Sequence, residues 1–182
     1  MNTKERVPPL PPEERDERQA DLVRQAGAEA GVYTTLVRAT EVFGDFVPFG
    51  RRLLRFSSLP PRERELLIMR TAFRCAAAYE WSHHDRIGRR AGLTDADIAV
   101  LARDAVADGD ADERTVLLIR TADELVADHV LSDATWARLA SAYTVGQVIE
   151  ICMLVGEYAM LAGTLNSLGV QIEDGYPQPP WT

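Results

Sequence analysis

Residues 59–92 gather acids and imidazoles within a helical pattern, and they are the part of the chain best suited to proton transfer. Glu80 and His84 lie four residues apart, so on a helix their side chains share one face, and His83 reaches the same side. A carboxylate beside an imidazole favours the protonated ring and can orient it, so such a pair can move a proton near neutral pH. The alternative is a solvent-exposed pair within one helix that has no chemical role.

Glu65 decides whether a third titratable group joins this pair. It stands fifteen residues before Glu80, and on one unbroken helix the two residues would be about 22 Å apart. Glu65 can face Glu80 and His84 only if the chain breaks near residues 74–77 and the second helix folds back. No glycine or proline stands there, so propensity alone does not predict the break. If the fold-back occurs, a buried Glu65 could hold and donate a proton.

Other residues of this stretch are candidates for contacting a substrate. Arg74 or Arg70 could bind a substrate carboxylate, although simple solvent exposure is the alternative for both. Tyr79 and Trp81 could form the wall of a pocket, although core packing would explain them equally well. His83 completes this set, since it lies beside the catalytic candidates.

A metal site is a weaker interpretation of the same cluster. Glu80, His83, His84 and Asp85 are possible ligand types, but their spacing does not match HExxH. Only one or two of these side chains can converge from a single helix, so we expect no metal at this cluster. The sequence also contains no glycine-rich phosphate loop, no nucleophile elbow and no CxxC.

Composition and charge narrow the class of protein. The chain has 182 residues, 46% of them hydrophobic, and a net charge of −8, so neither nucleic acid nor an anionic membrane is an expected partner. No run approaches eighteen uninterrupted apolar residues, and residues 1–18 lack the apolar segment of a signal peptide. Cys75 and Cys152 are expected to be reduced thiols of a cytoplasmic protein.

The predicted elements are all helical, because no stretch alternates with a period of two. Helices are expected at about 13–29 and 33–43, after Pro60-Pro61, through the polar cluster to Gly92, after Thr94, at 112–127, at 133–142, and from Thr144 to about Leu168. Gly44-Asp45 is expected to end the second helix, leaving residues 45–56 as an aromatic-rich patch suited to a pocket wall, a subunit contact or ordinary core.

Several short motifs together resemble the carboxymuconolactone decarboxylase family, which includes the alkylhydroperoxidase D (AhpD)-like proteins. The motifs are Leu59-Pro60-x-Arg62-x-Arg64-Glu65-Leu66, Tyr79-Glu80-Trp81-x-x-His84, Ala91-Gly92-Leu93-Thr94, Tyr158-x-Met160 and Leu165-Asn166-x-Leu168-Gly169. The resemblance covers about residues 45–170. It implies residues 1–44 as an N-terminal arm with helices, 45–170 as an AhpD-like helical bundle, and 171–182 as an extended tail.

The redox members of that family carry the pattern E-x11-C-x2-C-x3-H. Placing its histidine on His84 puts its glutamate on Glu65, whereas its two cysteine positions are occupied by Ala77 and Glu80. Without paired thiols there is no internal disulfide to cycle, which argues against peroxidase chemistry. The resemblance further implies a homo-oligomer, commonly a trimer or a dimer of trimers, and a decarboxylase branch that works without metal or cofactor.

Three functions from different classes follow. The first is a cofactor-free acid/base enzyme, of decarboxylase, lyase or isomerase type, that acts on a small organic acid or lactone. His84 would be its general acid or base, Glu80 would orient that ring or act as a second base, and Glu65 would donate a proton. The second is a degenerate AhpD-like protein with residual peroxiredoxin activity at Cys75. The third is a non-catalytic, ligand-binding member of the family.

Overall fold

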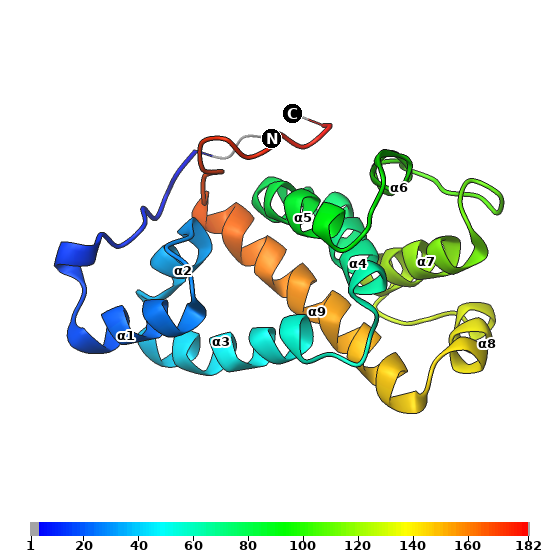
Figure 1. Ribbon diagram of the computed structural model, residues 1–182, viewed down its shortest axis with the longest axis horizontal. Coiled ribbons are helices and arrows are strands. Elements are labelled where there is room, and N and C mark those ends of the chain that lie inside the picture. The colour runs from blue at the N-terminus through cyan, green and yellow to red at the C-terminus, as the bar shows by residue number, and fades with distance from the viewer. Residues whose placement is uncertain (1–3, 182) are drawn as a thin grey trace.

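The computed structural model describes residues 4–181, and every regular element within them is a helix, as the sequence predicts. After a short 3-10 helix at Pro12–Glu14, the helices are α1 (Glu17–Ala26), α2 (Gly31–Leu36), α3 (Thr40–Arg55), α4 (Pro61–Arg74), α5 (Ala78–Arg90), α6 (Asp95–Leu101), α7 (Glu113–Ala127), α8 (Asp133–Ala142) and α9 (Val145–Leu168). Helix α9 crosses the middle of the molecule, with α1–α3 on one side of it and α4–α8 on the other (Figure 1).

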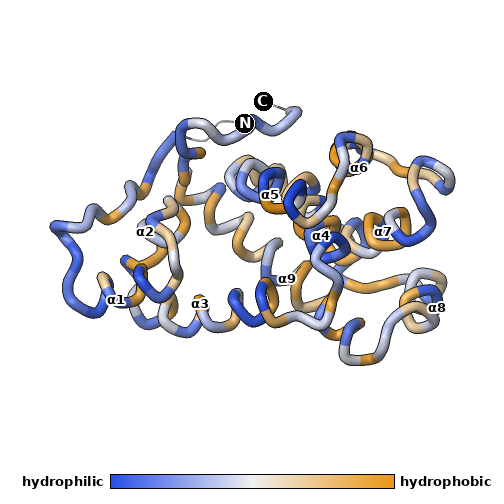
Figure 2. Tube along the Cα trace, viewed as in Figure 1, coloured by the Kyte–Doolittle hydropathy of each residue, from blue (hydrophilic) through white to orange (hydrophobic). Residues whose placement is uncertain are grey.

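Helix α9 is apolar on nearly all sides because it is the central helix of the bundle. It packs against α3, α4, α5, α7 and α8. Its length and composition alone would also suit a membrane span. In the fold, however, 44% of its most apolar 18-residue segment is buried inside the protein. Hydrophobic residues recur along α7 and α9, whereas the N-terminal arm is mainly hydrophilic (Figure 2).

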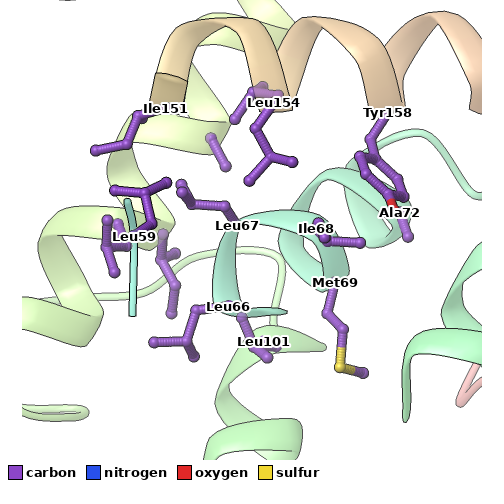
Figure 3. Close-up of a cluster of buried hydrophobic side chains, with 14 of the residues drawn as sticks. Leu59, Leu66, Leu67, Ile68, Met69, Ala72, Leu101, Ile151, Leu154 and Tyr158 are labelled. Carbon is purple, nitrogen blue, oxygen red and sulfur yellow. The ribbon is translucent and has the colours of Figure 1, made fainter. Parts of the chain in front are cut away.

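Helix α4 supplies the centre of the main core. Four consecutive residues, Leu66 to Met69, have no exposed surface, because α5, α7 and α9 enclose the helix on different sides. Figure 3 shows these side chains beneath Ile151 and Leu154 of α9. Full burial of one such side chain stabilises the fold by roughly 1.5–3 kcal/mol. This packing fixes the polar residues of α4 relative to α9.

The fold-back that Glu65 requires occurs at residues 74–77. Helix α4 ends at Arg74, and Ala76 adopts a left-handed backbone with φ of 49°. The Ala77 N–H donates to the Ala72 carbonyl at 2.8 Å, and the Ala76 N–H donates to the Phe73 carbonyl at 3.0 Å. These two bonds form a Schellman motif with alanine in the position that glycine normally takes. The left-handed alanine costs about 1 kcal/mol, which explains why propensity does not reveal the turn.

The prediction that Gly44-Asp45 ends a helix is wrong. Helix α3 runs through these residues and through Pro48, and the break falls at residues 37–39 instead. A proline inside a helix removes one backbone bond without always ending the helix. Here Phe43 and Val47 keep α3 in place by packing in a second, smaller core with Val23 of α1. One face of α3 is thereby turned toward α9.

The described part of the N-terminal arm lies against the end of α9. The backbone N–H groups of Arg6 and Val7 donate to the Leu168 carbonyl at 2.9 and 3.1 Å. Gly169 ends α9 in the left-handed region with φ of 68°, and a Cβ there would collide with the Lys4 carbonyl. The arm therefore depends on a glycine at this position.

Candidate active site

The fold-back of α5 onto α4 joins Glu65 to His84. Glu65 Oε2 lies 2.7 Å from His84 Nδ1, and the Glu65 side chain has no exposed surface. A carboxylate can only accept, so Nδ1 carries the proton of this bond, and Nε2 is the ring nitrogen that can accept a further hydrogen bond. Glu65 and His84 therefore meet, as the sequence predicts for a chain that folds back at residues 74–77. The catalytic roles of both residues stay predictions.

Tyr158 of α9 completes a chain of three side chains. Its hydroxyl lies 3.1 Å from His84 Nε2, and the two rings meet edge to face with centroids 5.1 Å apart. Burial, and then the nearby charge of Glu65, raise the pKa of Tyr158 well above its ordinary value. The phenol therefore stays protonated and donates to His84, so a proton can pass along Tyr158, His84 and Glu65.

This chain borders a cavity of about 460 Å³, a volume suited to a small ligand. Its apolar wall includes Val32, Phe46, Val47, Leu54, Leu161 and Leu165. Arg51, Arg55 and Arg64 also border it and supply positive charge. Among the described residues, no group of three or more His, Cys, Asp or Glu side chains is arranged to hold a metal ion. The cavity combines an apolar body, cationic groups and titratable side chains.

Glu80 lines the cavity, but it does not orient His84 as predicted. Glu65 occupies His84 Nδ1 and Tyr158 occupies Nε2, so no ring nitrogen is left for Glu80. Neither oxygen of Glu80 has a hydrogen-bond partner within the described part of the chain. Burial, and then Glu157, raise the pKa of Glu80 well above its usual range. Burial therefore favours the neutral, protonated form of Glu80.

His83 and Tyr79 also line the cavity, and the C-terminal tail holds both. Glu173 Oε2 lies 2.6 Å from His83 Nε2, and the Tyr79 hydroxyl donates to Glu173 Oε1 at 2.9 Å. The Gly31 N–H donates to the same carboxylate at 2.7 Å. Burial opposes ionisation of Glu173, but the hydrogen bonds from His83 and Gly31 lower its pKa to about 2. Tyr176 then stacks on the His83 ring at 4.1 Å.

Trp81 and Arg74 lie away from the cavity, which corrects their expected contact with a substrate. Trp81 is 1% exposed and packs in the core against Phe73 and Trp181, with ring centroids 6.2 and 5.0 Å away. Arg74 points to Asp123, with 3.6 Å between Nε and Oδ1. Core packing, the alternative for Trp81, describes its position better. Arg74 is partly exposed, as its alternative of solvent exposure has it, and pairs with Asp123.

Sequence reasoning missed two polar residues of α9 that face the cavity, Glu157 and Tyr158. Glu157 is 6% exposed, and burial raises its pKa to about 7. Tyr158 stands in one of the motifs that carry the family resemblance, and that was the available signal. Helical periodicity could not find either residue, because α9 is apolar all round.

The Cys75 thiol is expected to be unreactive. Burial, and then Glu80, raise its pKa to about 11, although Arg74 opposes the shift. Only about one thiol in ten thousand is then ionised at pH 7. We expect iodoacetamide to alkylate Cys75 at least about 100-fold more slowly than it alkylates free cysteine, as measured by mass spectrometry. Cys152 serves as an internal reference, since burial raises the pKa of that thiol too. Alkylation of Cys75 as fast as free cysteine would contradict this and favour the redox alternative.

Comparisons with known proteins agree with this architecture. Residues 40–123 match the model of the carboxymuconolactone decarboxylase family. A structure of the debrominase Bmp8 with 2,3,4-tribromopyrrole has a TM-score of 0.75 and 17% identity, covering 96% of this chain and 95% of the other. The AhpD core of a peroxidase-related protein from Ralstonia eutropha JMP134 has a TM-score of 0.71 and 19% identity, covering 91% and 87%.

A protein of unknown function from Agrobacterium tumefaciens has a TM-score of 0.65 and 15% identity, covering 75% of this chain and 94% of its own. At such identities these structures show the shared fold alone. No curated protein matches the sequence. The match of residues 40–123 and the shared architecture lead to one conclusion: the chain has an AhpD-like all-α fold, and residues 40–123 are similar to the carboxymuconolactone decarboxylase family.

Proposed function

We propose that the protein is a cofactor-free acid/base enzyme that acts on a small, enolisable organic acid or lactone. The observation that carries this proposal is the hydrogen-bonded chain of Glu65, His84 and Tyr158 at the edge of a cavity of about 460 Å³. A buried carboxylate that fixes one nitrogen of an imidazole leaves the other nitrogen to exchange a proton, here through the Tyr158 hydroxyl. This row of three hydrogen-bonded side chains contains no thiol.

The chemical step is removal of a proton from carbon beside a carbonyl group. The Tyr158 hydroxyl passes its proton to His84 Nε2 as it takes the proton of the C–H bond, so the net proton comes to the imidazole. The electron pair of that bond forms a carbon–carbon double bond, and the carbonyl oxygen becomes an enolate oxygen. Glu65 stabilises the imidazolium through Nδ1. Return of the proton to another carbon would complete an isomerisation.

The arginines of the cavity favour an anionic substrate. Arg51 and Arg55 belong to α3 and are exposed, and Arg64 begins the second turn of α4. The row of Tyr158, His84 and Glu65 is called the proton chain. Arg64 Nε lies 3.4 Å from Glu65 Oε1, so it links the cavity edge to the proton chain. If the carboxylate of a substrate binds to these guanidinium groups, its carbonyl group can extend into the cavity. A small oxo acid or lactone acid fits this arrangement.

The homo-oligomer implied by the family remains part of the proposal. Ile149, Met153 and Met160 of α9 are exposed by 54%, 45% and 56%. They lie at helical spacing on one side of α9, and Phe56 at the end of α3 is 62% exposed. Apolar side chains grouped in this way support association with further copies of the chain.

The proposal is tested by solvent exchange. Small oxo acids and unsaturated lactone acids are incubated with the protein in D₂O, and ¹H NMR follows loss of the C–H signal beside the carbonyl. For substrates that the wild type exchanges, Tyr158→Phe is expected to lower the rate at least about 10-fold, because the hydroxyl that relays the C–H proton to Nε2 is removed.

Tyr143→Phe is the matched control, since its hydroxyl donates to Glu63 at 2.7 Å and borders no part of this cavity. That variant should exchange at the wild-type rate. The proposal fails if the wild type exchanges none of these compounds, or if Tyr158→Phe exchanges them as fast as the wild type does.

A further inference from the structure

Two buried carboxyl groups of the cavity take no part in the proton chain. Glu80 of α5 is 3% exposed and Glu157 of α9 is 6% exposed, and both border the cavity. Both oxygens of Glu80 and Oε2 of Glu157 lack a hydrogen-bond partner within the part of the chain that the structure describes. Buried polar atoms are nearly always hydrogen-bonded, because leaving them unpaired costs about 1–3 kcal/mol each in free energy. The pair is therefore built to meet a ligand.

The surroundings of these two acids favour their neutral form. Burial, and then Glu157, raise the pKa of Glu80, and burial raises the pKa of Glu157 to about 7. No ion pair joins either carboxyl to an arginine among the described residues. A neutral carboxylic acid has an O–H donor, which a carboxylate lacks. Two such donors in one cavity are suited to an oxygen atom that gains negative charge.

The fold sets the pair next to the proton chain. Glu80 lies one helical turn before His84 on α5, and Glu157 directly precedes Tyr158 on α9. Glycine at position 50 of α3 makes room for Glu157, because a Cβ there would lie 2.8 Å from Glu157 Oε1. Three helices thus place the two acids at the cavity that the proton chain borders.

We propose that Glu80 and Glu157, as neutral acids, bind the carbonyl oxygen of the substrate and stabilise the enolate oxygen that forms there. This inference rests on the proposed function and assigns the second half of the same reaction. As the C–H proton leaves toward Tyr158, the carbonyl π electrons move to oxygen, and the O–H groups of the pair donate to it. No oxidant or reductant enters this step. The substrate class is accordingly a carbonyl compound with a carboxylate for the arginines.

The test compares 2-naphthol, a stable cyclic enol, with naphthalene, which has the same body and no oxygen. Fluorescence titration at pH 6, below the pKa of Glu157, gives the two dissociation constants. The wild type is expected to bind 2-naphthol about 10-fold more tightly than naphthalene, because the oxygen gains hydrogen bonds from the pair. In Glu157→Leu this preference should be lost, and in Glu80→Gln, which keeps an N–H donor, most of it should remain.

Two further variants keep the result interpretable. Gly50→Ala displaces the Glu157 carboxyl without removing it and should lower the preference, so it decides the matter if Glu157→Leu does not fold. Glu150→Gln is the matched control, because that carboxylate binds Ser57 and Ser58 outside the cavity, and it should leave the preference unchanged.

Equal affinity of the wild type for both probes would overturn the inference, as would a preference that survives in Glu157→Leu and in Gly50→Ala. The solvent-exchange assay tests the proton chain independently of the acid pair. A naphthol preference that depends on Glu157 supports the acid pair even if no compound exchanges, whereas exchange without that preference supports the proton chain and refutes the pair.

Discussion

Replacing His84 by alanine is expected to slow solvent exchange of substrate C–H protons by about 10²–10⁴-fold. In the proposed reaction His84 receives the proton, since Nε2 faces Tyr158 at 3.1 Å and Nδ1 is fixed by Glu65 at 2.7 Å. Removal of the imidazole leaves no group at this position that can receive the proton. The measurement is the exchange rate by ¹H NMR, normalised to the folded fraction from circular dichroism.

Two variants make this result specific. Alanine leaves Glu65 buried without its main partner, so His84→Gln is measured as well, because its amide can donate to Glu65 but cannot titrate. Both variants should lose exchange to a similar extent. His129→Ala is the matched control, since His129 is exposed just beyond the end of α7 and should not affect the rate. Wild-type exchange in His84→Gln would show that the imidazole is not the base.

Replacing Arg70 by alanine is expected to lower the free energy of unfolding by about 3–5 kcal/mol. The Arg70 side chain has no exposed surface, and its guanidinium donates to both Asp123 oxygens at 2.6 and 2.7 Å. It also donates to the carbonyls of Leu101 and Arg103 at 2.9 and 2.6 Å. Alanine would leave buried acceptors unpaired and open space in the core. Urea unfolding followed by circular dichroism measures the difference.

A surface ion pair provides the comparison for Arg70. Arg120 lies 3.2 Å from Asp108, with 40% and 76% of the two side chains exposed. Arg120→Ala should therefore change the free energy of unfolding by less than about 1 kcal/mol. A loss of that small size in Arg70→Ala would mean that the buried network contributes little, and that α4 is held by its apolar contacts alone.

The helices were predictable where a local signal marks their ends. Thr94 and Thr144 form the expected capping boxes at the starts of α6 and α9, and Gly169 ends α9 in the left-handed region. These motifs work through bonds within four or five residues, so the sequence around them is sufficient. The meeting of Glu65 with His84 could be stated only as a condition, because Ala76 takes a conformation that its residue type disfavours.

The rest of the site depends on contacts between distant segments. Tyr158 and Glu157 stand on a helix without a polar face, so no periodicity tells which neighbour they meet. Helix α3 continues past Gly44 because its packing outweighs local propensity. A tryptophan such as Trp81 suits a pocket wall as well as a core. It lies in the core here because it packs against Trp181, which is a hundred residues later in the sequence.

The C-terminal tail has a consequence for how a shortened protein should be designed. Trimming the chain after α9 would look harmless, since residues 171–181 form no helix and are rich in proline. Such trimming would delete the carboxylate that holds His83 and Tyr79, and the indole of Trp181 that covers Trp81. A minimal recombinant version therefore extends through Trp181, and an affinity tag is better attached beyond that residue through a flexible spacer.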